Sequence, residues 1–207
     1  MNCSTSHATK VRKINWYSTL VFAGFLASPI AGFAQNYNSQ DHDRDQDAPP
    51  TPVQIVALDE CDPKTFNDAL GADFCKNVTL GAFTTLDKLF KLAKDGTPDP
   101  GWDFEPDTLR IKKGTPIIVV DQGGEPHTFT EVKQFGGGFI PDLNHGEATV
   151  PECADGFKNL AVARTRILQG SQLLVPSLSK GDHNFQCCIH PWMRVTVEVQ
   201  DALHGNH

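Results

Sequence analysis

The residues with the clearest capacity for chemistry stand near the C-terminal end of the chain, in the segment CCIHPWM. This segment places Cys187, His190 and Met193 at intervals of three residues. A thiolate and a thioether are soft ligands, and together with an imidazole they suit copper, above all Cu(I). A type 1, or blue, copper site binds the metal with two histidines and one cysteine, and adds a weak axial methionine. The segment therefore contains all but one of the ligands that such a site needs.

The missing histidine must come from another part of the chain. His127 is the best candidate, because it follows a Gly-Glu-Pro turn and opens a segment of alternating polar and apolar residues. We therefore predict that His127, Cys187, His190 and Met193 bind one copper ion. Zinc is a weaker alternative, because methionine is a poor zinc ligand and structural zinc sites prefer four nitrogen or sulfur donors.

Two adjacent cysteines could supply the thiolate, and the period of a strand separates them. Residues two apart on a strand share a face, so Phe185 and Cys187 share one face and Cys188 points to the other. Cys187 also has the longer spacing to His190. We assign Cys187 to the metal and leave Cys188 free for a disulfide. A centre in which two thiolates bridge two coppers does not fit, because adjacent cysteines point in opposite directions.

Short strands are expected to position these residues. From about residue 104 the chain consists of short apolar or alternating segments separated by Gly, Pro and Asp, a pattern that indicates an all-β sandwich or barrel. Residues 134–160, with three successive glycines, indicate a long loop. The predicted strands lie at about residues 109–111, 117–120, 127–132, 161–167, 173–175, 183–187 and 195–199.

A strand and two helices are predicted ahead of these strands. Residues 53–56 form a short apolar run that indicates a strand. Asp62 and Pro63 are a helix cap followed by proline at the first helical position, and Gly71 is the stop signal. Residues 84–95 carry apolar side chains at helical spacing. We expect this helical block to pack on the sandwich.

The first 34 residues are predicted to be a secretory signal peptide. Cationic residues precede an apolar run from Trp16 to Ile30, and Gly32-Phe33-Ala34 places small residues at the positions that a signal peptidase reads. An uncleaved membrane anchor is the alternative, but the run is short for a span and is interrupted by proline. We expect cleavage after Ala34 and a periplasmic or secreted protein without a membrane span.

The expected mature chain has room for one domain with a real core. It comprises residues 35–207, and the loss of three cations takes the formal net charge from −7 to −10. This acidity argues against nucleic acid as a partner. The expected divisions are 1–34 signal peptide, 35–52 disordered acidic tail, 53–102 helical N-terminal extension, 103–201 the β domain with the metal ligands, and 202–207 C-terminal tail.

The C-terminal part resembles the cupredoxins, the superfamily of plastocyanin, azurin and amicyanin. In that family a strand ends at the copper cysteine, a short loop carries His and then Met, and the next strand follows at once. The Cys-x-x-His-Pro-x-Met loop of this chain is closest to that of amicyanin. Phe185 matches the family's aromatic position, and residues 104–114 are similar to its first conserved strand pair. The resemblance covers about residues 103–200, whereas 53–100 and 134–160 mark a distinct periplasmic branch.

The resemblance implies a mainly β, Greek-key sandwich and a protein that carries one electron at a time by cycling copper between Cu(I) and Cu(II). It implies that the exposed edge of His190 is the electron port, with Pro191 and Trp192 as an apolar docking patch. The family commonly has an asparagine after its first copper histidine, which supports the cysteine loop by hydrogen bonds. Thr128 stands at that position here.

The cysteines after Ala34 are odd in number, which in an oxidising compartment leaves one thiol for another task. One metal thiolate and two disulfides account for all of them. Cys61 with Cys75 would close a helical hairpin, and Cys153 in the long loop is the natural mate of Cys188. Other connectivities stay open at this point, because sequence alone does not decide pairing.

We therefore expect a monomeric electron carrier, not an enzyme, with a redox protein such as a cytochrome or an oxidoreductase as its partner. The alternative is a protein that sequesters or delivers copper without cycling its redox state. Such a protein would favour extra Met or His ligands, yet the chain has only 2 Met. A copper enzyme would need an open coordination position, which a methionine-capped site lacks.

Overall fold

The computed structural model of the chain describes residues 50–76 and 83–201. The expected signal peptide and C-terminal tail lie outside the described residues, as does most of the expected acidic tail. Among the residues that are described, no helix is both long and apolar enough to cross a membrane.

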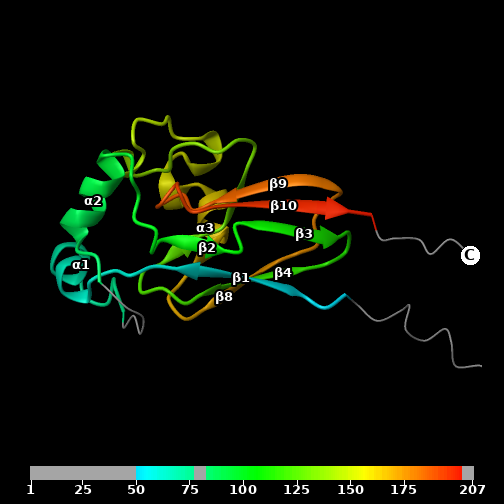
Figure 1. The fold of residues 1–207 in the computed structure, drawn as a ribbon, viewed down its shortest axis with the longest axis horizontal. Helices are drawn as coiled ribbons and strands as arrows, with labels where there is room; N and C mark the ends of the chain where they lie inside the picture. Colours follow the sequence, from blue (N-terminus) through cyan, green and yellow to red (C-terminus); the bar gives the residue numbers. More distant parts are fainter. Residues whose placement is uncertain (1–49, 77–82, 202–207) are drawn as a thin grey trace, which may run out of the picture. The chain divides into compact units, whose positions relative to one another are not determined.

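Short strands make up most of the regular structure (Figure 1). In chain order they are β1 (Val53–Leu58), β2 (Asp103–Glu105), β3 (Thr108–Lys112), β4 (Ile117–Asp121), β5 (His127–Thr128), β6 (Thr130–Val132), β7 (Arg166–Ile167), β8 (Gln172–Val175), β9 (Gly181–Gln186) and β10 (Arg194–Gln200). One four-stranded sheet has the order β2-β1-β4-β8, another has the order β3-β10-β9-β6, and β5 pairs with β7. The pairs β1–β4 and β3–β10 are parallel.

The two larger sheets pack together through side chains that alternate along their strands. In β1 the buried residues are Ile55 and Ala57, and in β10 they are Val195, Val197 and Val199. This period of two is the pattern of strands with one face toward a core. All five residues belong to one hydrophobic cluster. The predicted mainly β sandwich is therefore confirmed.

The first strand is part of one of the sheets and does not belong to a separate unit with the helices that follow it. β1 lies between β2 and β4, and its Ala57 is level with Asp121 at the end of β4. The segment 53–102, expected as a helical extension, therefore begins with a strand of the sandwich. The strand predicted over 53–56 is confirmed, and it extends to Leu58.

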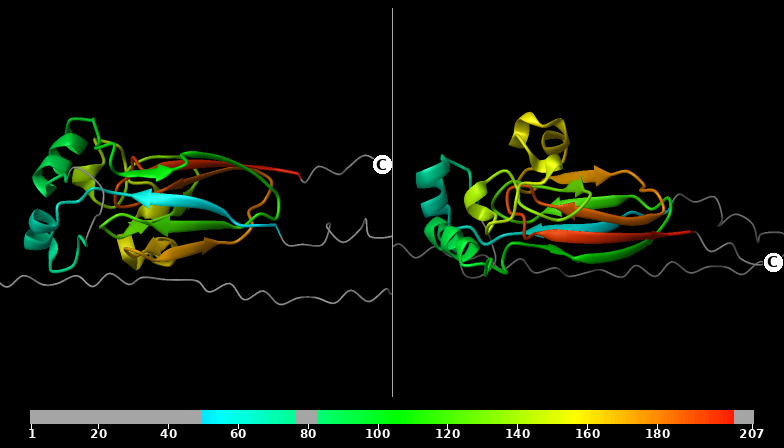
Figure 2. Two further views of the ribbon diagram at one scale, coloured as in Figure 1. Left: turned by 60° about the horizontal axis from the view of Figure 1, so that its bottom comes forward. Right: turned by 90° about the horizontal axis from the view of Figure 1, so that it is seen from above.

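Two helices follow β1 and lie beyond one end of the sheets (Figures 1 and 2). α1 (Pro63–Leu70) begins where the Asp62 carboxylate accepts the Thr65 N–H at 3.1 Å. It ends at Gly71, whose φ of +113° is open to glycine because it has no Cβ. α2 (Leu86–Lys94) corresponds to the second predicted helix. Both helices are thus confirmed.

The long segment between β6 and β7 differs most from expectation. It contains three short 3-10 helices, η1 (Pro141–Leu143), η2 (Pro151–Cys153) and η3 (Gly156–Lys158). α3 (Leu160–Arg164) then occupies residues predicted as a strand, so that prediction is wrong. The Asn159 side chain starts the helix by accepting the Ala161 N–H at 3.0 Å. Only β7 remains extended in this stretch.

Two disulfides tie these additions to the sandwich. Cys61 is bonded to Cys75, and Cys153 is bonded to Cys188, so both predicted pairs are confirmed. The first bridge joins the segment after β1 to the segment after α1. The second anchors the long segment directly beside Cys187, the free cysteine of the described residues.

Candidate metal centre

The candidate cysteine ligand stands in a tight loop between β9 and β10. Cys187 follows the last residue of β9, and Met193 precedes the first residue of β10. The Cys187 N–H donates to the Met193 carbonyl at 3.0 Å, and the Met193 N–H donates to the His190 carbonyl at 3.0 Å. The backbone thus closes the loop on itself. Both Cys187 and Met193 are fully buried.

Two imidazole nitrogens face the Cys187 sulfur. The Nδ1 atoms of His127 and His190 each lie 3.9 Å from Sγ, and the centroids of the two rings are 5.4 Å apart. With bonds of about 2.3 Å to sulfur and about 2.0 Å to nitrogen, as in zinc sites, an ion at a trigonal angle would hold such donors roughly 3.8 Å apart. The spacing fits one ion, and these donor types suit copper.

The surroundings of the sulfur favour its thiolate form. Burial alone would raise the pKa of Cys187, but hydrogen bonds with His127 and His190 hold that pKa well below its usual value. Burial would lower the pKa of His127, yet hydrogen bonds with Asp59 and Cys187 raise it well above the ordinary value. The backbone N–H groups of Thr128 and His190 also donate to Sγ at 3.5 Å. These contacts therefore favour the thiolate, which is the form of cysteine that binds metals.

Thr128, at the family's asparagine position, supports the cysteine loop through its hydroxyl group. The Thr128 Oγ1 accepts the Cys188 N–H at 2.7 Å, while its own backbone N–H donates to the Cys187 sulfur. From the other side, the Phe139 N–H donates to the Cys188 carbonyl at 2.9 Å. Gly138 passes so close to that carbonyl that any Cβ would overlap it. The loop is therefore held in place from two directions.

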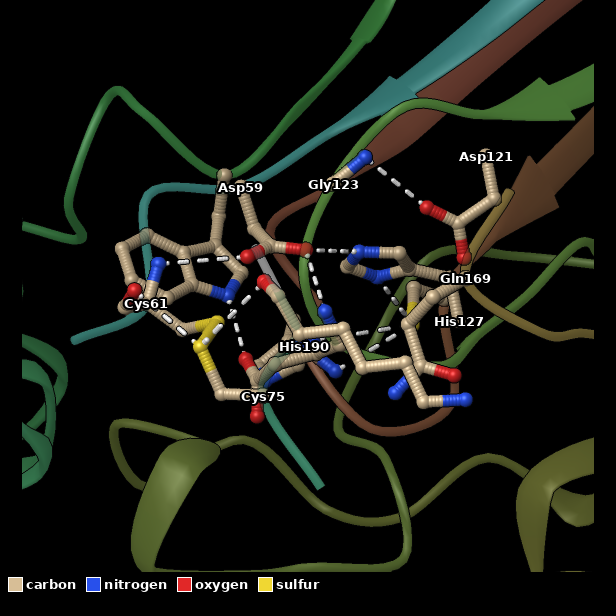
Figure 3. A network of polar contacts seen from close by, with 12 residues as sticks. Asp59, Cys61, Cys75, Asp121, Gly123, His127, Gln169 and His190 are labelled. Carbon is tan, nitrogen blue, oxygen red and sulfur yellow. Dashed lines mark hydrogen bonds and ion pairs between the residues drawn. A yellow bond between two sulfur atoms is a disulfide. The ribbon is translucent and has the colours of Figure 1, made fainter. Parts of the chain in front are cut away.

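Asp59, which the sequence pattern did not indicate, holds the other nitrogen of His127 (Figure 3). Its Oδ2 lies 2.9 Å from the His127 Nε2. Backbone N–H groups of Glu125 and Cys61 donate to its two oxygens at 2.9 and 3.2 Å. Burial would raise the pKa of Asp59, but the hydrogen bond with His127 lowers it below its usual value. The contact holds the ring with Nδ1 toward the sulfur.

Glu125 has the corresponding place beside His190. Its Oε2 lies 3.4 Å from the His190 Nε2 and accepts the Trp102 indole N–H at 2.8 Å. Trp102 in turn stacks on Phe66 of α1, with ring centroids 6.2 Å apart. Burial raises the pKa of Glu125 above its usual value. Through these contacts the helical segment reaches the second histidine.

The edge of His190 is covered, so the prediction that this edge is exposed is wrong. Its exposed fraction is only 2%. Trp102, from the segment between β1 and β2, and Trp192, from the loop itself, both lie against its ring, with centroid distances of 6.2 and 5.5 Å. Pro191 is buried, and Trp192 is partly exposed. Of the predicted apolar patch, therefore, only Trp192 reaches the surface.

A third buried acid lies close to His127. Asp121 ends β4, and its Oδ1 accepts the Gly123 N–H at 2.9 Å. Burial raises the pKa of Asp121 to about 7. In the described part of the chain, Asp59, Asp121 and His127 each place one potential ligand atom within 4.8 Å of the others, as His127, Cys187 and His190 do in the first group.

Sequence position offered only a partial signal for these three acids. Glu125 stands two residues before His127, and Asp121 ends an apolar run, where a buried acid is uncommon. Asp59 is 68 residues from His127 along the chain. Only the pairing of β1 with β4 brings it to the site.

The fold and the loop together define the class of the protein. A sandwich of two four-stranded sheets carries Cys, His and Met in one loop between two adjacent strands, and carries a further His at the start of a strand near them. This arrangement is cupredoxin-like. The expected resemblance is thus confirmed at the level of the fold.

Comparisons with solved structures return cupredoxins. A purple cupredoxin from Nitrosopumilus maritimus matches with a TM-score of 0.38 and 14% identity, over 72% of this chain and 99% of that one. A Cu(I) structure of an amicyanin mutant matches with a TM-score of 0.30 and 15% identity, over 47% of this chain and 73% of that one. No protein-family model and no curated protein matches the chain.

Proposed function

We propose that this protein is an exported one-electron carrier with a single type 1 copper site formed by His127, Cys187, His190 and Met193. One observation carries the proposal: the Nδ1 atoms of both buried histidines face the buried Cys187 sulfur at 3.9 Å. Copper bound there would gain and lose one electron. Cys187 and the two histidines would hold the ion, and the buried Met193 is the candidate fourth ligand.

The surrounding contacts support a rigid site. The Cys187 sulfur is held by two backbone N–H groups, and the remote nitrogens of both histidines lie against the buried carboxylates of Asp59 and Glu125. Ligands that are fixed before the metal arrives move little when its charge changes. Little movement favours fast electron transfer over chemistry that opens a coordination position for substrate, so we propose a carrier and not an enzyme.

Trp192 is the proposed exit for the electron. His190 is covered, but Trp192 packs on its ring at 5.5 Å between centroids and is partly exposed. Trp192 also lines a surface pocket together with Pro98, His145 and Arg194. A redox partner such as a cytochrome or an oxidoreductase would therefore dock against Trp192 and not against His190.

Burial of the ligands bears on the alternative of copper delivery. Cys187, His127 and His190 are 0%, 0% and 2% exposed. Delivery requires an acceptor to exchange ligands with the metal, which demands access to it. The burial of these ligands therefore favours retention of copper, as a carrier requires. Sequestration without redox cycling stays the competing hypothesis, and the experiment below separates the two.

We also propose that the protein works as a monomer in the periplasm or outside the cell. Two disulfides support this location, because such bonds persist mainly in oxidising compartments. The signal peptide that would direct export remains a prediction from the sequence.

The test is a visible absorption spectrum of the mature protein titrated with Cu(II). We expect an intense band near ~600 nm from thiolate-to-copper charge transfer at a site with two histidines and one cysteine. Cys187→Ser should abolish the band, whereas Cys188→Ser should keep it. A colourless protein that binds Cu(I) tightly would refute the carrier and favour sequestration. A protein that binds no copper would refute the site itself.

A further inference from the structure

A second group of potential ligands, with Asp59 and Asp121, lies beside the His127 ring (Figure 3). The Nδ1 atom of this ring faces Cys187. It consists of Asp59, Asp121 and His127, with one potential ligand atom of each within 4.8 Å of the others. The His127 Nε2 lies 2.9 Å from the Asp59 Oδ2. These residues are 3%, 1% and 0% exposed. Two carboxylates and an imidazole are thus enclosed together away from water.

The fold assembles this group from neighbouring parallel strands. β1 and β4 are parallel, and Ala57 of β1 is level with Asp121, the last residue of β4. The carboxyl ends of parallel strands meet at one edge of a sheet, so Asp59, two residues after Ala57, lies beside Asp121. The chain after β4 then folds over Asp59, and Gly123 passes so close that any Cβ would overlap the Asp59 Oδ2.

One oxygen of the buried Asp121 carboxyl group has no protein partner. The Asp121 Oδ1 accepts the Gly123 N–H at 2.9 Å, but the buried Oδ2 has no hydrogen-bond partner among the described residues. Burying a polar atom without a partner costs free energy, and native structures pair nearly all such atoms. The Asp59 oxygens, in contrast, are oriented by N–H groups of Cys61 and Glu125, as ligating carboxylates usually are.

We propose that Asp59, Asp121 and the Nε2 of His127 form a second metal site, for a divalent cation of the zinc type. Carboxylate oxygen and histidine nitrogen are zinc ligands. This set of three contains no sulfur ligand, so its metal preference differs from that of the Cys187 site, where the thiolate favours copper. Donors about 2.1 Å from a shared ion at roughly 90–110° lie about 3.0–3.4 Å apart. The 2.9 Å between His127 Nε2 and Asp59 Oδ2 lies just below the lower end of this range.

The second site shares His127 with the proposed copper site, so this point rests on the proposed function. The two buried acidic side chains beside the ring could offset the charge of a divalent ion, which matters because an uncompensated charge in a buried site is costly. The second ion should consequently shift the thiolate–copper band.

The experiment is a titration of copper-loaded, chelator-washed protein with Zn(II), followed by gel filtration and metal analysis. We expect the native protein to retain one zinc per chain. Asp121→Asn, which keeps side-chain size, should weaken zinc binding at least tenfold, or about 1.4 kcal/mol, while it keeps the thiolate–copper band as proof of folding. Asp142→Asn, at an exposed position, is the matched control and should bind zinc normally.

A second pair of variants separates this proposal from the proposed function. Cys187→Ser should lose the copper band but keep zinc binding. The double variant, with both Cys187→Ser and Asp121→Asn, should lose zinc binding as well. A copper band in native protein that retains no zinc, or retains zinc equally well after Asp121→Asn, would overturn the second site alone. If the native protein shows no copper band but binds zinc in a way that depends on Asp121, the carrier is refuted and the second site is supported.

Discussion

The carboxylate of Asp59 lies 2.9 Å from the Nε2 of His127, and both side chains are fully buried. The contact is made at the ring nitrogen opposite to the one that faces Cys187. It therefore orients the imidazole before any metal arrives, in the way that carboxylates behind metal-bound histidines do. It also places a negative charge close to the proposed copper, with only the His127 imidazole ring between them.

Asp59→Asn should raise the reduction potential of the copper. The amide can still accept a hydrogen bond from His127, but the lost negative charge no longer favours Cu(II) over Cu(I). Copper affinity should fall about 10–100-fold, as for other residues that support a metal ligand. A redox titration of zinc-free protein measures the potential, with Asp142→Asn as the control. An unchanged potential would contradict this role for Asp59.

Trp192→Leu should slow electron transfer without changing the copper site. Leucine keeps an apolar side chain but removes the aromatic ring that packs on His190. The absorption band and the potential should stay as in the native protein, whereas electron exchange with an inorganic redox complex should slow several-fold. Stopped-flow measurements give the rates. Equal rates in both proteins would place the exit elsewhere on the surface.

Thr128→Val should destabilise the fold while the copper band persists. Valine has the same shape but cannot accept the buried Cys188 N–H, which Thr128 binds at 2.7 Å. A buried donor left without a partner costs about 1–3 kcal/mol. The backbone N–H of residue 128 still reaches the Cys187 sulfur. Urea unfolding measures the loss, and Thr128→Ser, which restores the hydroxyl, should recover most of it.

His183 should stabilise the fold more at low pH than at high pH. Its ring nitrogens lie 2.6 Å from Glu131 Oε1 and 2.9 Å from the Ser179 carbonyl, an arrangement that suits the doubly protonated ring. Burial alone would lower the pKa of His183, but these hydrogen bonds raise it above its usual value. The stabilisation is thus complete below the unfolded-state pKa and is lost as the pH rises through the folded-state pKa.

Glu131→Gln tests this pH dependence. The variant should unfold about 0.5 kcal/mol more easily than the native protein below the unfolded-state pKa of about 6.5. The difference should shrink as the pH rises through the folded-state pKa of His183. Urea unfolding at several pH values measures it. A difference that is constant with pH would mean that Glu131 acts without the His183 charge.

Much of the fold could be predicted because short periods in sequence encode local structure. The alternation along residues 195–199 identified the strand that became β10, and Asp62 with Pro63 identified the start of α1. The same reasoning failed at Ala161 and Ala163. Alanine alternation carries no strong strand preference, and the cap at Asn159 decided for a helix.

The sequence by itself determined which donors meet in the cysteine loop. Cys187, His190 and Met193 are close along the chain, so a loop between two strands is enough to bring them together. It also indicated that Cys187, and not Cys188, is left unpaired, because neighbouring side chains on a strand face opposite ways.

Only the tertiary structure decided what surrounds those donors. Asp59 reaches His127 because β1 pairs with β4, and Trp102 covers His190 because the chain between β1 and β2 returns over the site. The contact between Asp59 and His127 joins residues 68 positions apart. Local periodicity carries no information about such partners, since they meet only after the sheets have formed. For this reason the ligand candidates could be identified from the sequence, whereas their carboxylate supports and their burial could not.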